Sequence, residues 1–190
     1  MRVSRIQAAE NREAVINVAS RLFRERGFDG IGLKDLMKGA GLTQGAFYKQ
    51  FASKEDLAAQ ASRRALESAT RRWLAAAVAN PKDPLGAVIA FYLSMEHREE
   101  RMDGCPVVAL GSDAARQGID VKTSFEAGIK GYLEILRRLI AEADGEQRKA
   151  MAILSTMVGA LTLSRAVNDP DLAQAFLEAA TEQVRQAVAA

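Results

Sequence analysis

The sequence has very few of the residues that form disulfides and metal sites. Its 190 residues include one cysteine, Cys105, and one histidine, His97. A single cysteine excludes an intrachain disulfide and a four-cysteine metal site. We therefore expect no metal and no cofactor, and a reducing, cytoplasmic setting.

Aromatic residues and long apolar runs are also scarce. Phe, Trp and Tyr make up 6% of the chain, which argues against a β-sandwich, and only 4 prolines interrupt it. No apolar run approaches the length of about 20 residues that a membrane helix needs, and the first residues lack the apolar run of a signal peptide. Because Ala, Leu, Arg and Glu dominate, the composition predicts a soluble, all-α protein with no membrane partner.

The net charge of +2 is small, but the positive charge is concentrated near the start of the chain. Residues 1–60 contain ten Lys and Arg against seven Asp and Glu. This modest basic bias is compatible with a nucleic-acid partner for the first third of the chain.

The stretch Leu33–Lys54 has the pattern of two short helices joined by a tight turn. Leu33, Leu36 and Met37 share one helical face, Gly41 permits the positive φ that ends a helix, and Thr43 can cap the next one. This pattern predicts a helix-turn-helix whose second helix reads DNA.

The second helix of this motif has an inner and an outer face. Phe47 and Phe51 are expected in the core. The outer face is expected to carry a base-reading amide, a residue that permits close backbone approach and two phosphate-contacting residue types. These are Gln44, Gly45, Tyr48 and Lys49.

The remaining chain reads as helices separated by glycine and proline. The predicted ranges are 6–26, 54–80, 85–102, 106–117, 121–143, 146–167 and 171–188, with Gly145 closing the fifth of these. Met1–Arg5 is either a basic arm that contacts DNA through Arg2 and Arg5 or a frayed terminus.

These motifs resemble the TetR/AcrR family of one-component transcriptional regulators. The residues that carry the resemblance are Ala19, Leu22-Phe23, Gly27-Phe28, the run Gly41–Phe51 and Ser53-Lys54-Glu55. Two positions depart from the family pattern: Ile31-Gly32 stands where Thr or Ser is usual, and Gln44 stands where Lys is common. The resemblance implies about nine helices, with a DNA-binding domain at 1–53 and an effector-binding and dimerisation domain at 54–190.

The resemblance also implies a repressor that binds a palindromic, double-stranded DNA operator as a homodimer. One reading unit buries too little surface for tight specific binding, so two half-sites are the physical expectation. The implied DNA contacts are Lys34, Thr43, Gln44, Gly45, Tyr48, Lys49 and Lys54. The expected dimer surface lies on the last two helices, at Leu154, Val158, Leu161, Leu172, Phe176, Ala180 and Val184.

A small apolar effector is expected to release the repressor, with an alternative route through Cys105. Candidate effector-binding residues are Trp73, Phe91, Tyr92, Met95, Cys105, Phe125 and Met157, each of which can also be ordinary core. The step Gly104-Cys105-Pro106 places the thiol at a helix start, where backbone dipoles stabilise a thiolate. It resembles the Gly-Cys step of family members that sense electrophiles, although a buried structural cysteine fits as well.

Two other classes of function compete with this one. The first is a thiol enzyme that uses Cys105 with His97 as base, for which the sequence offers no third orienting group, and so we expect no catalytic residues. The second is a helical scaffold without DNA binding. Steep loss of DNA affinity as salt rises would distinguish a regulator from both.

Overall fold

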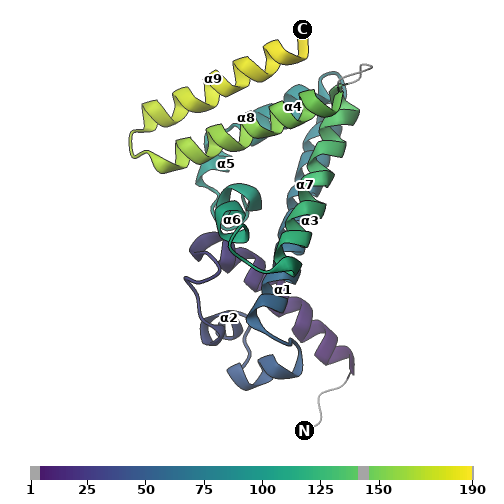
Figure 1. The fold of residues 1–190 in the computed structure, drawn as a ribbon, viewed down its shortest axis with the longest axis vertical. Coiled ribbons are helices and arrows are strands. Elements are labelled where there is room, and N and C mark those ends of the chain that lie inside the picture. The colour runs from purple at the N-terminus through teal and green to yellow at the C-terminus, as the bar shows by residue number, and fades with distance from the viewer. Residues whose placement is uncertain (1–4, 141–145, 190) are drawn as a thin grey trace. The chain divides into compact units, whose positions relative to one another are not determined.

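The computed structural model describes residues 5–140 and 146–189, and the regular secondary structure of this part is all helical, without strands. It contains nine α-helices and one 3₁₀ helix, which confirms the predicted all-α class (Figure 1). In chain order they are α1 (Arg5–Arg26), α2 (Leu33–Gly39), η1 (Gln44–Lys49), α3 (Lys54–Ala79), α4 (Pro84–Tyr92), α5 (Met95–Glu99), α6 (Pro106–Ala114), α7 (Ile119–Ile140), α8 (Glu146–Ala166) and α9 (Pro170–Ala189).

Some sequence-based predictions concern residues that lie outside the described part. These are the basic arm with Arg2, although Arg5 itself begins α1, and the role of Gly145. Across 5–140 and 146–189, no helix combines the length and apolar character that crossing a bilayer requires.

The chain divides into two compact units. The first unit comprises the chain up to Glu67 together with Arg101–Glu126, and the second comprises Ser68–Glu100 together with the chain from Ala127 onward. The boundaries fall within α3 and α7. The predicted domains at 1–53 and 54–190 are a functional division and stay a prediction, whereas the compact units assign α6 to the same body as the helix-turn-helix.

The core of the first unit forms where α1 packs against α2 and α6. Phe23 of α1 meets the ring of Phe28 edge-on, with 5.2 Å between centroids, and Phe47 stacks on Phe51 at 5.4 Å. All four rings are buried. Helix α1 ends at Gly27, whose φ of 77° only glycine adopts readily.

The structure corrects two details of the predicted helices. The second helix of the motif is a six-residue 3₁₀ helix, and the side chain of its N-cap Thr43 makes no capping hydrogen bond. The helix expected over 85–102 is broken into α4 and α5, because the Ser94 hydroxyl accepts a hydrogen bond from the backbone N–H of His97 and starts a new helix.

The second unit is built around the α8–α9 pair. These two helices pack along one another (Figure 1). In addition, α5 packs on α8, and α4 packs on α9. The inward-facing residues of the pair are small or aliphatic, among them Ala160, Leu161, Ala173 and Leu177. Close packing of these side chains buries one face of each helix and leaves the other face uncovered.

Candidate nucleic-acid interface and effector site

The turn of the helix-turn-helix is fixed by backbone hydrogen bonds at the end of α2. The N–H of Gly41 donates to the carbonyl of Lys38 at 3.0 Å, and the N–H of Leu42 donates to that of Met37 at 2.9 Å. With φ of 70° at Gly41, this is the Schellman arrangement that satisfies the last carbonyls of a helix. The chain is thereby turned sharply into η1.

Neighbouring aromatic residues of η1 differ sharply in their exposure to solvent. Phe47 is fully buried, whereas Tyr48 is 68% exposed, and the two rings meet edge-on at 5.3 Å between centroids. A Cβ added at Gly45 would have nothing within 4 Å, so the backbone of η1 is open on that side. Since a 3₁₀ helix has about three residues per turn, Gly45 and Tyr48 lie on the same edge.

Most of the predicted DNA contacts are on the surface. Thr43, Gln44, Gly45, Lys34 and Lys49 are exposed, and Lys54 is half-buried at the start of α3. The motif also exposes Lys38 in the last turn of α2, which the sequence-based set omitted. Four lysines and one aspartate over 33–54 give this surface a positive charge suited to phosphate.

Helix α6 is tied to the end of α1 by buried polar contacts. Nη1 of Arg24 donates to the carbonyl of Gly104 at 2.9 Å, and its Nε donates to the carbonyl of Ser20 at 2.9 Å. The Asp113 carboxylate accepts a hydrogen bond from the N–H of Phe28 at 3.3 Å. Arg24 was not identified as a buried residue from the sequence. The one hint in the sequence is that this charged residue follows Phe23 on an otherwise apolar face of the helix.

A second contact joins the loop after α6 to the beginning of α3. A Cβ added at Gly118 would lie 1.9 Å from Oε1 of Glu55, so the glycine leaves room for that side chain. Lys54, the adjacent residue, is one of the predicted DNA contacts. The first unit therefore holds α6 against the end of α1, and the loop that follows α6 against the start of α3.

Cys105 lies at the start of α6 but is not on the surface. It occupies the N-cap position, directly before Pro106, and its side chain is 2% exposed. The preceding carbonyl, that of Gly104, is the one that Arg24 holds. Reagents in solution reach a buried thiol such as this one only through local opening of the structure around it.

Three of the predicted effector residues come together in an aromatic cluster of the second unit. Trp73 stacks on Tyr132 at 4.6 Å between centroids and meets Tyr92 edge-on at 5.4 Å. Phe91 stacks on His97 at 5.4 Å between centroids, and the Arg72 guanidinium lies over the Phe91 ring, 4.8 Å from its centroid. Tyr132 and His97 were not in the predicted set.

The cluster keeps His97 neutral. Burial lowers the pKa of His97 to about 4, a shift that Arg165 and Arg72 add to and that the hydrogen bond with the Tyr92 backbone opposes. Nδ1 of the ring lies 2.7 Å from the Tyr92 carbonyl oxygen. This nitrogen is engaged within the second unit, so the arrangement gives no support to a thiol enzyme with His97 as its base.

The other predicted effector residues are dispersed. Met157 of α8 is fully buried and Met95 of α5 is half-buried in the second unit, while Phe125 and Cys105 are buried in the first. Across the described ranges, no group of three His, Cys, Asp or Glu side chains could hold a metal ion.

The predicted dimer residues fall on both faces of α8 and α9. Leu154, Leu161, Ala180 and Val184 are buried inside the chain, where they pack in its own core, and the dimer surface itself stays a prediction. Leu172 is exposed, and Val158 and Phe176 are half-buried. The sequence predicted a wide apolar stripe on these helices. It did not show which residues of the stripe are buried within the chain and which remain on its surface.

The exposed faces of the two helices are nonetheless apolar. Met151 and Leu163 of α8 are 46% and 50% exposed, and Leu172 of α9 is 45% exposed. Between Ala150 and Ser164, α8 has no charged residue. A Cβ added at Gly159 would meet nothing within 4 Å, so the backbone of α8 is accessible on this face.

Comparison with known proteins places the helix-turn-helix in a described family. Residues 15–61 match the sequence model of the bacterial regulatory proteins of the tetR family. The HTH-type transcriptional repressor NemR of Escherichia coli strain K12 is 25% identical over 134 residues, covering 69% of this chain and 67% of NemR. The HTH-type transcriptional regulator LmrA of Bacillus subtilis strain 168 is 23% identical over 163 residues, covering 82% of this chain and 86% of LmrA.

Solved structures extend the similarity to almost the whole chain. The reduced form of E. coli NemR superposes with a TM-score of 0.78 at 20% identity, covering 93% of this chain and 96% of that one. A TetR transcriptional regulator from Chloroflexus aurantiacus gives a TM-score of 0.79 at 26% identity, covering 97% and 96% of the two chains. The likeness therefore includes the helices that follow the helix-turn-helix.

Proposed function

Because this chain belongs to the TetR/AcrR family of DNA-binding transcriptional regulators, we propose that it is a repressor that an effector releases from a palindromic operator. The observation that carries the proposal is the surface of η1. Gln44, Gly45, Tyr48 and Lys49 are exposed together, next to a fully buried Phe47 that fixes the helix in place. Since it acts on DNA, we place it in the cytoplasm.

Different residues of this surface contact the bases and the phosphates of the DNA. Gln44 presents an amide that can pair with adenine in the major groove, and Gly45 allows the backbone close to the bases. Tyr48 and Lys49 contact flanking phosphates, as do Thr43, Lys34 and Lys54. Phosphate contacts fix the register and base contacts supply the sequence preference. The exposed Lys38 adds a further phosphate contact.

We propose that the operator-binding form is a homodimer joined through the exposed faces of α8 and α9. Met151, Val158 and Leu163 on α8, with Leu172 and Phe176 on α9, form an uncharged surface. The open backbone at Gly159 supports close helix crossing. A two-fold axis through this surface would present two copies of η1 to two half-sites.

We propose two routes for the effector signal. In the first, a small apolar molecule enters the region of Trp73 and Tyr92, where apolar and aromatic side chains predominate. In the second, an electrophile or oxidant modifies Cys105 at the start of α6. The similarity to NemR, a repressor solved in a reduced form, favours the second route.

Either route has to alter the spacing of the two reading helices. Helix α3 begins at Lys54, a proposed DNA contact, and continues to Ala79 in the second unit, so its movement as a lever would misalign the two reading helices. For a change at Cys105, α6 offers a shorter route to the DNA-binding region, because the contacts of Arg24 and Asp113 connect it to the end of α1. The difference in effector affinity between the two states limits how far the population shifts.

Binding of the purified protein to its own upstream DNA tests the function. We expect binding that weakens steeply as salt is raised, because lysines on the motif release counterions from phosphate. If binding does not respond to salt, or if the protein does not bind, the proposed function is wrong and the thiol-enzyme and scaffold alternatives remain.

The same assay with N-ethylmaleimide separates the two effector routes. If Cys105 is the sensor, the reagent abolishes operator binding by the wild-type protein and leaves a Cys105→Ser variant bound. If both proteins stay bound after complete alkylation of Cys105, the thiol route is wrong and an apolar effector remains. Serine is a suitable replacement because it preserves the size of the buried side chain.

A further inference from the structure

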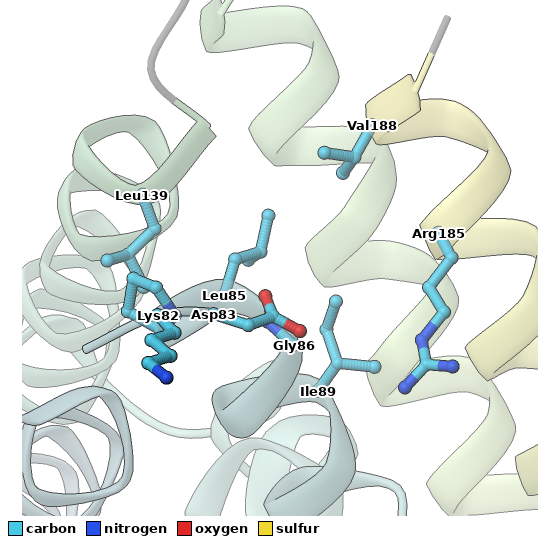
Figure 2. Close-up of a pocket in the computed structure, with 9 residues that line it drawn as sticks. Lys82, Asp83, Leu85, Gly86, Ile89, Leu139, Arg185 and Val188 are labelled. Atoms are coloured by element: carbon cyan, nitrogen blue, oxygen red, sulfur yellow. The ribbon is translucent and has the colours of Figure 1, made fainter. Parts of the chain in front are cut away.

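A pocket lies in the second unit at the end of three helices. It has a volume of about 550 Å³ and is lined by the start of α4, the end of α7 and the end of α9 (Figure 2). This volume lies within the range of about 300–1,000 Å³ that is typical of small-molecule sites. Among the described residues that line it, none belongs to the predicted effector set.

One part of the lining is apolar. Leu85 and Ile89 are buried in α4, and Leu139 of α7 and Val188 of α9 are half-buried. Figure 2 shows these four aliphatic side chains around the pocket, contributed by three different helices. A hydrocarbon or aromatic ring that covered them would remove apolar surface from water.

The rest of the lining is charged, with positive charge in excess. Lys82 and Arg185 are both exposed, and Figure 2 places them on opposite sides of the pocket, with Asp83 between them. The Asp83 carboxylate already accepts a hydrogen bond from the N–H of Gly86 at 2.8 Å, as the N-cap of α4. Its negative charge is thus partly balanced by the positive end of that helix.

We propose that this pocket binds an amphipathic organic anion, at a site separate from the aromatic cluster and from Cys105. The apolar part of the ligand lies against Leu85, Leu139 and Val188. Its carboxylate, sulfonate or phosphate pairs with Arg185, whose planar guanidinium can donate two parallel hydrogen bonds, and Lys82 adds a second cation.

Binding there would join α4 to α9. The two helices already pack on each other, and the proposed ligand touches both, so the ligand-bound second unit is stabilised in proportion to ligand concentration. This inference does not depend on operator binding, because it concerns ligand affinity alone.

Isothermal titration of the full-length protein with octanoate tests the proposal, with octanamide as an uncharged probe of the same size. We expect octanoate to bind at least about tenfold more tightly than octanamide, because only the carboxylate forms a charge-assisted pair with Arg185. Equal affinities for the two probes would contradict the proposed anion recognition.

Two variants locate the site. Arg185→Gln should weaken octanoate binding about tenfold, whereas Arg63→Gln, which removes an exposed arginine from the first unit, should leave it unchanged. Val188→Trp should fill the apolar part of the pocket and abolish binding. Circular dichroism melting establishes that each variant is folded. Octanoate binding that survives both pocket changes in folded protein would overturn the proposal.

Discussion

Arg98 and Arg165 each hold the C-terminal end of the other's helix. Nε of Arg98, on α5, donates to the carbonyl of Ser164 at 2.8 Å, and an Nη donates to that of Val167 at 3.1 Å. Arg165, on α8, donates in return to the carbonyls of Arg98 at 2.9 Å and His97 at 2.7 Å. The last carbonyls of a helix lack partners within it, so this exchange satisfies both ends at once.

The exchange predicts that lysine cannot replace Arg165. A lysine ammonium cannot span the two carbonyls with a planar fork, so Arg165→Lys should lower the free energy of unfolding by about 1–3 kcal/mol. Urea denaturation measures this loss. Arg148→Lys, at an exposed position of the same helix, is the matched control and should change stability by less than about 0.5 kcal/mol. Equal effects from the two substitutions would contradict the role given to Arg165.

Stability should also fall in mild acid because of His97. Its pKa is about 4 in the folded protein and near 6.5 when unfolded, so between these values the unfolded chain binds a proton that the folded chain does not. Above pH 6.5 His97 is neutral in both states and does not lower the free energy of unfolding. As the pH falls from 6.5 toward 4, proton uptake by the unfolded chain lowers this free energy. From pH 7 to pH 5 the loss should be about 2 kcal/mol. Urea titrations at both pH values should show it for wild type and a smaller loss for His97→Gln; identical losses would exclude His97 as the cause.

Neighbouring aromatic residues of η1 should behave oppositely when truncated. Tyr48→Ala removes an exposed ring, so operator affinity should fall while the melting temperature stays nearly unchanged. Phe47→Ala removes a fully buried ring and should lower the free energy of unfolding by about 3–5 kcal/mol. Fluorescence anisotropy with operator DNA and thermal melts measure the two effects. Loss of fold in Tyr48→Ala would contradict the surface assignment.

The sequence predicted this motif well because its determinants are local. Gly41 has the positive φ that the pattern required, and the periodicity correctly assigned Phe47 and Phe51 to the core. The 3₁₀ geometry of η1 was not predicted, because helix type over six residues depends on tertiary packing rather than on residue propensity.

Features that depend on distant parts of the chain were harder to predict. From the sequence alone, Arg24 is predicted to be exposed, because arginine is usually on the surface. Its burial depends on the segment around Gly104, its hydrogen-bond partner, which is 80 residues away. The apolar stripe of α8 did not show that Leu161 faces inward and Leu163 outward. Such assignments require knowledge of which element packs on which face.

The exposed face of α8 predicts a dimer that one charge can disrupt. Val158→Arg would place an unpaired cation in an apolar interface, which should raise the dimer dissociation constant by at least about 100-fold. Asn80→Arg, at an exposed position directly after α3 and outside α8 and α9, adds the same charge and should leave the dimer intact. Sedimentation velocity over a concentration series measures both. If the Val158→Arg protein remains as dimeric as the control, the dimer surface lies elsewhere.

The contacts of two arginines on α1 predict how the reactivity of Cys105 is controlled. Arg24 is buried and holds the Gly104 carbonyl next to the thiol, while the exposed Arg21 pairs only with the Asp103 carboxylate at 3.1 Å in the described contacts. Arg24→Gln should release this segment and raise the rate of alkylation by N-ethylmaleimide at least about tenfold, because reagents reach a buried group through local opening.

Arg21→Gln removes the same charge without touching the Gly104 carbonyl, so its alkylation rate should stay within about twofold of wild type. Rates are measured by mass spectrometry under native conditions, with unfolded protein as the reference for a fully accessible thiol. Equal rates for the two variants would mean that Arg24 does not control access to Cys105. A faster rate in Arg24→Gln alone would identify the end of α1 as the element that controls access to the thiol.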